Sequence, residues 1–342
     1  MNNGKVSEIL KNDNEHIYQN LKDLSSLENS TILVTGSSGF LGKTVISFLN
    51  FLNETKLEKN KNQINIIALD YEDHDICKPM GQFISADTVD YIINCAGIAS
   101  PKKYLKKPVE TLDVSYLGTK NIFELAQIKN TKSILMFSSS EVYGTPDTGN
   151  IPTKEKYIGS VTTFGNRSCY DIGKNVLESL CYVYYTKHAV PVNVLRPFNL
   201  YGPLMDINDG RIIPNICKAM LEGENFSVYG NGKQTRTYCY ATDAMVYMFS
   251  VLLSDNFGKI YNIGSDDEEL SASGLAEVVY GFMEPKNSHP IISEYPDDYP
   301  NQEPSRRCPD ISKIKNLSGY LPQYSLSQGF RSCYDFFKAE YY

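Results

Sequence analysis

The sequence is poor in histidine, with four such residues, and its eight cysteines form no CxxC pair. Structural metal sites usually draw their ligands from such pairs, and the histidines are too few and too far apart to replace them. We therefore expect no metal site. Scattered cysteines without a disulfide framework are typical of reduced thiols in a cytoplasmic protein, which is the location we expect.

There is also no excess of basic residues, since 33 Lys and Arg stand against 40 Asp and Glu and the formal net charge is −7. We interpret the short Lys-rich stretch 102–107 as a solvated loop, so the charge pattern does not favour a nucleic-acid partner. No apolar run is long enough to span a bilayer, and the polar start MNNGKVSEILKNDNE lacks the apolar segment of a signal peptide. We expect no membrane partner.

The chain does have 342 residues, of which 42% are hydrophobic and 21% charged, as in a globular protein with a sizeable core. Strand and helix patterns alternate from residue 31 to residue 196, which predicts an α/β fold with a doubly wound parallel sheet. After residue 197 the loops are rich in Pro, Gly, Asn and Tyr, which indicates a smaller second lobe.

The first 29 residues precede the first strand, and their apolar residues recur at helical spacing. This spacing predicts an amphipathic helix with an interruption near residues 12–14. Because its polar side carries as much acid as base, we expect it to pack on the main body or on a partner subunit rather than on a membrane. The residues of the apolar face are Val6, Leu10, Ile17, Leu21 and Leu24.

The most informative stretch reads TILVTGSSGFLG, at 31–42, where a short apolar strand is followed by three glycines at three-residue spacing. A strand that turns tightly into a helix needs residues without Cβ where the backbone approaches a ligand, and the helix N-terminus presents free N–H groups to an anion. This predicts a dinucleotide pyrophosphate site; a glycine-rich turn without a ligand is the alternative. The site residues are Gly36, Ser38, Gly39, Phe40, Leu41 and Gly42.

The second strand, QINIIALD at 63–70, ends in Asp70. A carboxylate at this place accepts hydrogen bonds from the adenosine ribose and disfavours a 2′-phosphate, so we expect NAD rather than NADP as the cofactor. An acid of a solvated loop is the alternative. The next clear strand, YIINC at 91–95, is followed by Ala96, at the strand end where ligands lie in open parallel sheets.

Two residues one helical turn apart, Tyr170 and Lys174, share a face of the helix predicted over 168–188. An ammonium beside a phenol stabilises the phenolate and lowers its pKa from about 10 towards neutral, which makes the phenol a general base. Ser139, at the Ser-rich end of the strand 133–138, can hydrogen-bond a substrate oxygen in the same crevice. A surface pair and a helix cap are the alternatives.

These features resemble the extended branch of the short-chain dehydrogenase/reductase superfamily, which implies a Rossmann sheet with a substrate-binding lobe. More specific blocks resemble the UDP-glucuronic acid decarboxylases, also called UDP-xylose synthases, over about residues 31–330. The blocks are IASPKKYLKKP (98–108), SSEVYG (139–144), RSCYDIGKNVLESLCYVYY (167–185), RPFNLYGP (196–203), NDGR (208–211), VYGNGKQTRTYCY (228–240) and RRCPDI (306–311).

The resemblance implies that Tyr170, helped by Lys174 and Ser139, removes the C4 hydroxyl proton of UDP-glucuronic acid while a hydride passes to NAD. The 4-keto sugar acid would lose CO2, and return of the hydride would give UDP-xylose, unless the 4-keto precursor is released. Ser140, Glu141 and Arg307 are implied around the carboxylate and C5. Further implied contacts are Asp75, Ile76, Ala96 and Arg211 to the cofactor, and Ser100, Tyr104, Asn199, Arg236 and Arg307 to the substrate.

Position 140 separates the related activities. Nucleotide-sugar 4,6-dehydratases carry an Asp before the Glu, which protonates the departing hydroxyl, whereas Ser140 cannot act as that acid at neutral pH. A 4-epimerase needs no pair such as Glu141 and Arg307, so decarboxylation is favoured. The alternatives are a 4-epimerase, a 4,6-dehydratase and, from another class, a catalytically silent NAD(H)-binding sensor.

Three features depart from the decarboxylase pattern. Only 23 residues separate Asp70 from Asn94, where the family has a longer ribose loop and a further strand, of which 74–76 would be the remnant. Leu204 replaces the usual Arg after YGP, and the N-terminal extension is unusual. These departures suggest that adenosine is bound differently, or that the protein has a related activity on another nucleotide-linked sugar.

We divide the chain into an N-terminal helical extension (1–29), a Rossmann domain that binds NAD (30–198, with a return segment at about 239–264) and a mainly nucleotide-sugar-binding lobe (199–342). The helices expected at 109–129 and 170–187 are apolar on their outer faces, which suggests a homodimer; the sheet is their alternative partner.

Overall fold

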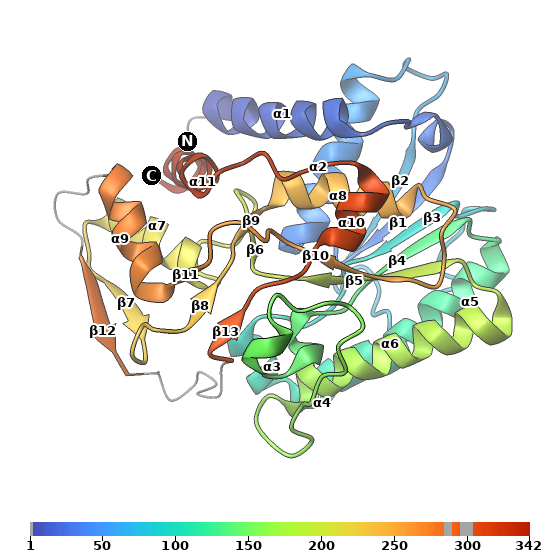
Figure 1. Cartoon of the computed structure of the whole chain (residues 1–342). Helices are drawn as coiled ribbons and strands as arrows, with labels where there is room; N and C mark the ends of the chain where they lie inside the picture. The colour runs from blue at the N-terminus through green and yellow to red at the C-terminus, as the bar shows by residue number, and fades with distance from the viewer. Residues whose placement is uncertain (1–2, 284–288, 295–303) are drawn as a thin grey trace.

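The computed structural model describes residues 3–283, 289–294 and 304–342 and is built around a six-stranded parallel sheet (Figure 1). The strand order is β10-β5-β4-β3-β1-β2, so the order reverses at β1. This confirms the doubly wound α/β fold and places its ligand crevice beyond the carboxyl ends of β1 and β3. The strands are β1 (Thr31–Thr35), β2 (Asn65–Leu69), β3 (Tyr91–Asn94), β4 (Ser133–Phe137), β5 (Val192–Pro197) and β10 (Ile260–Ile263).

Helices cover both faces of this sheet, with α2 and α8 on one face and α5 and α6 on the other (Figure 1). Successive strand residues point to opposite faces. In β1, Ile32 and Val34 therefore join the core under α2 and α8, while Leu33 joins the core under α5 and α6. Burial on both sides explains why these strands read as continuous apolar runs. The helices are α2 (Phe40–Thr55), α5 (Thr119–Lys129), α6 (Ser168–His188) and α8 (Ala241–Leu252).

The segment between β2 and β3, residues 70–90, forms turns and no strand, so β2 is the edge of the sheet. The expected strand remnant at 74–76 is not a strand. Its Ile76 is buried in the core beside α5, where the Asn121 side chain donates a hydrogen bond of 2.7 Å to the Ile76 carbonyl oxygen. The short connection is thus anchored by packing rather than by strand pairing.

The second lobe has its own core, formed by α7, α9, α11 and short strands. The chain leaves the main sheet after β5, returns to it with α8 and β10, and then re-enters the lobe. The remaining helices are α3 (Pro101–Lys106), α4 (Pro108–Asp113), α7 (Ile212–Glu222), α9 (Ala272–Met283), α10 (Ser312–Ser318) and α11 (Leu326–Tyr341), with a π-helical segment, η2 (Val114–Gly118), joining α4 to α5. The three small sheets are β11-β8-β13, β12-β7 and β6-β9, with bounds β6 (Leu200–Tyr201), β7 (Phe226–Tyr229), β8 (Thr235–Arg236), β9 (Cys239–Tyr240), β11 (Leu270–Ser271), β12 (Pro290–Ser293) and β13 (Arg306–Arg307).

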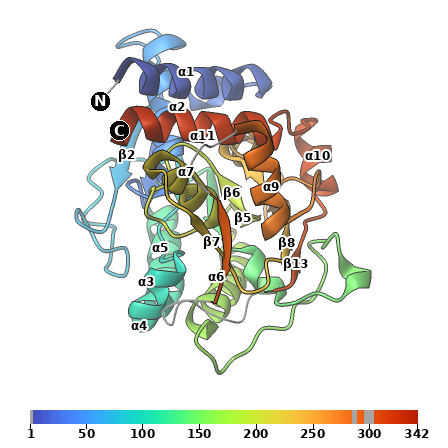
Figure 2. The ribbon, with the colours of Figure 1, turned by 90° about the vertical axis from the view of Figure 1, so that its left-hand side faces the viewer.

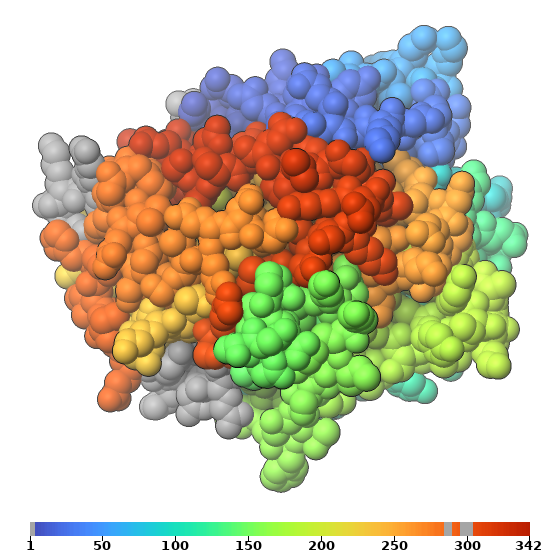
Figure 3. Space-filling model, in the orientation of Figure 1, coloured from blue at the N-terminus to red at the C-terminus, as the bar shows by residue number. Residues whose placement is uncertain are grey.

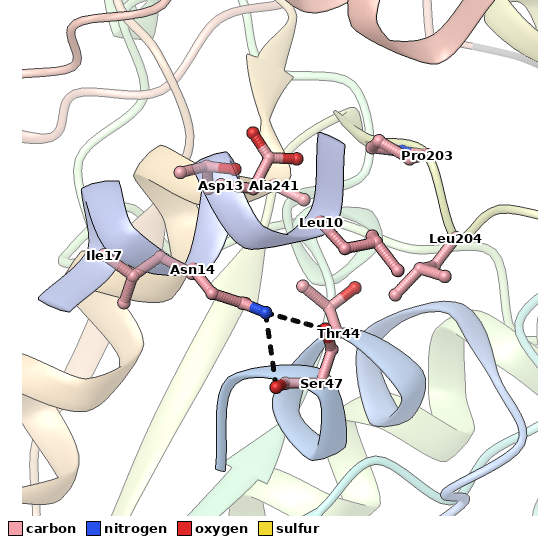
Figure 4. Close-up of a pocket in the computed structure, with 10 residues that line it drawn as sticks. Leu10, Asp13, Asn14, Ile17, Thr44, Ser47, Pro203, Leu204 and Ala241 are labelled. Carbon is pink, nitrogen blue, oxygen red and sulfur yellow. Dashed lines mark hydrogen bonds between the residues drawn. The ribbon is translucent and has the colours of Figure 1, made fainter. Parts of the chain in front are cut away.

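The N-terminal helix α1 (Asn3–Asn20) lies across α2 and α8 and beside α11 (Figures 1 and 2). It is not interrupted near residues 12–14, where Asp13 and Asn14 are buried and hydrogen-bonded to the body of the protein while Asn12 is exposed. Asn14 donates to the Ser47 hydroxyl at 2.9 Å and to its carbonyl oxygen at 3.3 Å, as Figure 4 shows. In Figure 3, α1 forms a ridge above the C-terminal helices, so it packs on the body of its own chain.

Within the described ranges, no helix combines the length and the apolar character needed to cross a bilayer. The same ranges contain no group of three or more His, Cys, Asp and Glu side chains placed to hold a metal ion. All eight cysteines are free thiols.

Candidate active site

The glycine loop after β1 is shaped by close backbone approaches. Gly36 has a φ of +63°, and a Cβ there would lie 2.7 Å from the backbone nitrogen of Ala96, which follows β3. A Cβ on Gly42 would lie 2.1 Å from the carbonyl oxygen of Gly36. Helix α2 begins after Gly39 without a side-chain cap, so its first N–H groups remain available to an anion. The loop therefore fits a pyrophosphate group.

Asp70, immediately after β2, contacts this loop directly. The backbone N–H and the hydroxyl of Ser38 donate hydrogen bonds of 2.8 and 2.6 Å to its Oδ2. Partial burial alone would raise the pKa of the Asp70 carboxyl, but the hydrogen bonds from Ser38 and from the N–H of Tyr71 outweigh it and lower this pKa. The carboxylate is thus ionised at neutral pH and placed where an adenosine ribose is bound in Rossmann folds.

Asp75 lies in the turn of residues 70–90, and its carboxylate accepts a hydrogen bond of 2.9 Å from the Cys77 N–H. Arg211, at the start of α7, is exposed, is paired with Asp209 and has its guanidinium 5.9 Å from the centroid of the Phe40 ring. Arg211 therefore lies close to Phe40, the first residue of α2 after the glycine loop.

Tyr170 and Lys174 project from α6 towards the carboxyl end of β4. The ammonium of Lys174 donates a hydrogen bond of 2.6 Å to the Phe137 carbonyl oxygen and lies 5.7 Å from the centroid of the Tyr170 ring. The Tyr170 ring also stacks on Tyr104 of α3 at a centroid distance of 5.2 Å. The three elements α3, α6 and β4 therefore meet at this phenol.

The expected lowering of the Tyr170 pKa is not what the structure shows. Burial raises this pKa to about 12, and a hydrogen bond with the Ser139 side chain offsets only part of the effect. Burial also lowers the pKa of Lys174 to about 8. The reason is that desolvation disfavours the charged form of each group, while the ammonium is bound to the Phe137 carbonyl oxygen. The phenol is protonated in this state of the protein.

A second charged group lies next to this trio, in the short helical turn η3 (Ser140–Tyr143). Oε2 of Glu141 accepts a hydrogen bond of 2.8 Å from Arg307 of β13 and another from Arg167. Arg307 also donates to the carbonyl oxygen of Ser140 and has a side chain that is only 4% exposed. Burial alone would raise the pKa of Glu141, but Arg307, Arg167 and Arg236 outweigh it, so this pKa is lowered.

Of the residues expected to contact substrate, Arg307, Arg236 and Tyr104 belong to this cluster. Arg236 pairs in register with Arg307 on neighbouring strands β8 and β13. Ser100 occupies the N-cap position of α3 without a side-chain cap hydrogen bond. Asn199, with a φ of +41°, donates a hydrogen bond of 3.0 Å to the Thr237 carbonyl oxygen.

Three buried polar atoms of this cluster have no hydrogen-bond partner among the described residues: the Tyr104 hydroxyl, Oδ1 of Asp171 and Nε of Arg307. Buried polar atoms are almost always satisfied, because leaving one unpaired costs about 1–3 kcal/mol. Their gathering at one place is what a binding site for a polar molecule requires.

The sequence reasoning missed Arg167 and Asp171. Nε of Arg167 lies 3.6 Å from Oδ2 of Asp171, one helical turn further along α6. Burial raises the pKa of Asp171 to about 6, although Arg167 acts in the opposite direction. The available signal was the four-residue spacing of opposite charges around Tyr170.

A glycine loop closed against β3, a carboxylate after β2 and a Ser-Tyr-Lys trio after β4 define a dinucleotide-dependent enzyme of the short-chain dehydrogenase/reductase class. The chain belongs to the NAD dependent epimerase/dehydratase family, whose model matches residues 32–264. Its cofactor is NAD, as the family description and the fit of the glycine loop agree.

Two relatives illustrate its place within this family. The chain is 34% identical to UDP-glucuronic acid decarboxylase 1 of Xenopus tropicalis, over 94% of its own length and 76% of the relative. It is 36% identical to UDP-glucuronic acid decarboxylase 6 of Arabidopsis thaliana, over 88% of its own length and 87% of the relative. The sequence resemblance thus extends well beyond the cofactor-binding segment.

Solved structures share the fold. UDP-glucose 4-epimerase of Thermotoga maritima superposes with a TM-score of 0.77 at 22% identity, covering 90% of this chain and 98% of the other. UDP-glucuronic acid 4-epimerase of Bacillus cereus, solved with UDP-glucuronic acid and NAD, gives a TM-score of 0.70 at 23% identity, covering 91% and 100% of the two chains.

Proposed function

We propose that this protein catalyses the NAD-dependent decarboxylation of UDP-glucuronic acid through a 4-keto intermediate. The two UDP-glucuronic acid decarboxylases that support this assignment align with 94% and 88% of the chain. In our proposal residues 30–198 with the return segment at about 239–264 bind NAD, and residues 199–342 mainly bind the nucleotide sugar. Helix α1 of the N-terminal extension (1–29) packs on α2 and α8 and on α11, and so connects the two parts.

The observation that carries the proposal is the arginine cluster around Glu141. Arg307 is buried, Arg236 lies beside it on β8, and Arg167 reaches the same carboxylate from α6. The guanidinium groups of Arg307, Arg167 and Arg236 all act on Glu141, and Arg236 acts on Glu269 as well. This positive field is suited to an anionic substrate, and a nucleotide-linked sugar acid adds a carboxylate to the diphosphate that every nucleotide sugar carries.

The neighbouring trio supplies the first chemical step. Tyr170 takes the proton of the C4 hydroxyl, and Ser139 orients the oxygen through its hydroxyl. Bound NAD supplies the hydride acceptor at C4 and, later, the donor that returns the hydride. Because Tyr170 is protonated with a pKa of about 12 in this structure, its phenolate needs stabilisation in the loaded complex. Lys174, 5.7 Å from the ring, is the cation placed to provide it.

The second step follows from the 4-ketone, which makes the substrate a β-keto acid. The bond between C5 and the carboxylate breaks, CO2 leaves, and the electron pair moves into the C4 carbonyl as an enolate. C5 then gains a proton. Glu141 and Arg307 lie next to Ser140 in the cluster that we assign to this end of the sugar. The hydroxyl of Ser140 is not acidic enough to protonate a leaving C6 hydroxyl, which argues against a 4,6-dehydratase.

We also infer that the protein is a homodimer. Helices α4 and α6 and the π-helical segment η2 carry large apolar side chains that are at least 38% exposed, on the face away from the sheet. Such a face on packed helices is suited to a second copy of the same helices. The exposed residues are Val109, Leu112, Tyr116, Leu117, Tyr182, Val183 and Tyr185.

We further propose that the protein is located in the cytoplasm, because its eight cysteines are free thiols and its cofactor is a nucleotide.

The test is mass spectrometry of the products formed from UDP-glucuronic acid and NAD. A product lighter by one CO2 supports the proposal, and its mass distinguishes UDP-xylose from the 4-keto precursor. A product of unchanged mass that separates chromatographically as UDP-galacturonic acid would show a 4-epimerase instead. Protein that binds NAD but alters no nucleotide sugar would point to the catalytically silent sensor.

A further inference from the structure

Arg167 stands immediately before α6, three residues ahead of Tyr170, and its side chain is only 12% exposed. Its guanidinium donates through Nη2 to Oε2 of Glu141 and places Nε 3.6 Å from Oδ2 of Asp171. One arginine therefore connects the turn that carries Glu141 to the helix that carries Tyr170. The two groups that we assign to C4 and to C5 are linked by this side chain.

The second arginine on Glu141 binds the same oxygen. Arg307 donates to Oε2 at 2.8 Å. Two arginines that donate to one carboxylate oxygen restrict the position of the carboxylate. Lysine could not reproduce this arrangement fully, because an ammonium lacks the planar fork of the guanidinium.

We propose that Arg167 is a positioning residue that holds Glu141 in its reactive placement, and that Asp171 orients Arg167. The proposal rests on the proposed function for the step that it serves, but the placement of Glu141 can be measured without that function. It assigns no contact between Arg167 and the substrate.

Charge on every side of Glu141 supports this role. Arg307 and Arg236 approach from the second lobe and Arg167 from α6, while Asp171 and the Tyr104 and Tyr170 phenols lie nearby. Burial raises the pKa of Asp171 to about 6, and Arg167 is the cation that most opposes this rise. Above that pH an ionised Asp171 attracts Nε of Arg167 and orients its other end towards Glu141. Below it, this orientation is weakened.

Kinetics provide the first test. In Arg167→Met we expect kcat for CO2 release to fall on the order of 10- to 100-fold with little change in KM, because a small displacement of a reacting group is costly. Arg167→Lys should recover part of the loss. Asp171→Asn should reduce the dependence of kcat on pH around 6. The control is Arg331→Met, since Arg331 of α11 donates a hydrogen bond to the Phe282 carbonyl oxygen of α9 and is not one of the residues assigned to the site.

A second measurement separates this proposal from the proposed function. NMR titration of the 13C-labelled Glu141 carboxyl, assigned with Glu141→Gln, should show its pKa rising in Arg167→Met and rising less in Arg167→Lys. Wild-type protein that releases no CO2 would overturn the decarboxylase assignment and leave this titration valid. A Glu141 pKa unchanged by Arg167→Met, or a kcat within about twofold of wild type for this variant, would overturn the positioning role. Arg167→Lys retains a cation if the Met variant does not fold.

Discussion

Arg236 and Arg307 are paired in register on the adjacent parallel strands β8 and β13. Two neighbouring guanidinium groups repel each other, and Arg236 contributes to a lowering of the Arg307 pKa that begins with burial. Glu141 is the carboxylate that compensates Arg307, through Oε2. A bound anion reduces this repulsion, and the carboxylate of a sugar acid is one anion that the two guanidinium groups are suited to bind.

Two consecutive arginines of β13 provide a matched pair of variants. Arg307 is buried against Glu141, whereas Arg306 has a side chain that is 40% exposed and pairs with Glu269. Arg307→Ala should lower kcat/KM for decarboxylation at least 100-fold, that is by about 3 kcal/mol or more of transition-state stabilisation. Arg306→Ala should change activity less than threefold, because exposed ion pairs contribute about 0–1 kcal/mol. Steady-state rates of CO2 release check both, and equal effects would exclude Arg307 from the reaction.

Tyr170→Phe removes the proton acceptor while keeping the ring that stacks on Tyr104 at 5.2 Å. We expect turnover to fall by about 10³-fold or more and the dissociation constant of NAD to change less than threefold. Isothermal titration calorimetry with NAD measures the second quantity on the same preparations. Residual turnover near the wild-type rate in Tyr170→Phe would assign the proton transfer to another group.

Two helical glycines, Gly42 and Gly281, allow the steric effect of an added Cβ atom to be compared with the effect of alanine on helix stability. A Cβ at Gly42 of α2 would lie 2.1 Å from the Gly36 carbonyl oxygen, whereas a Cβ at Gly281 of α9 would meet nothing within 4 Å. Gly42→Ala should therefore distort the loop and weaken NAD binding at least tenfold. Gly281→Ala should leave NAD binding unchanged and stabilise the fold by about 0.5–1 kcal/mol. NAD titration and urea unfolding of both variants test the contrast.

The sequence predicted the doubly wound sheet because its strands are continuous apolar runs, and it predicted the glycine loop because only glycine fits beside Ala96. It could not give the direction of the Tyr170 pKa. That direction depends on burial and on the contact of Lys174 with the Phe137 carbonyl oxygen, and neither is visible in a spacing. Arg167 was missed for a similar reason, since its partner Glu141 is 26 residues away in the chain.

The helix α1 shows the same limit of sequence patterns. Its polar residues at 12–14 predicted an interruption, yet two of them, Asp13 and Asn14, are buried and hydrogen-bonded to the rest of the chain. The Tyr240 hydroxyl donates a hydrogen bond of 2.8 Å to Asp13, and the Tyr320 hydroxyl lies between Asp243 and Nε2 of His16, 2.9 Å from the latter. Polar contacts with α8, β9 and the segment before α11 therefore fasten α1 to the body of the protein.

The buried carboxyl of this network makes stability depend on pH. Burial raises the pKa of Asp13 from 3.8 to about 7, so between these values the folded protein holds a proton that the unfolded chain releases. This contribution is present below about pH 4 and is lost as the pH rises to about 7. Asp13→Asn lacks it, so the unfolding free energy of the variant minus that of wild type should rise by on the order of 2–4 kcal/mol over this range.

His16, with a pKa lowered by burial, is present in both proteins, and its main charged neighbour is Asp243 rather than Asp13. Urea unfolding at several pH values measures the difference. The exposed Asp23 has its pKa lowered by Ser25, so Asp23→Asn should show no such rise. A difference for Asp13→Asn that stays constant from pH 4 to pH 7 would mean that Asp13 is ionised in the folded protein.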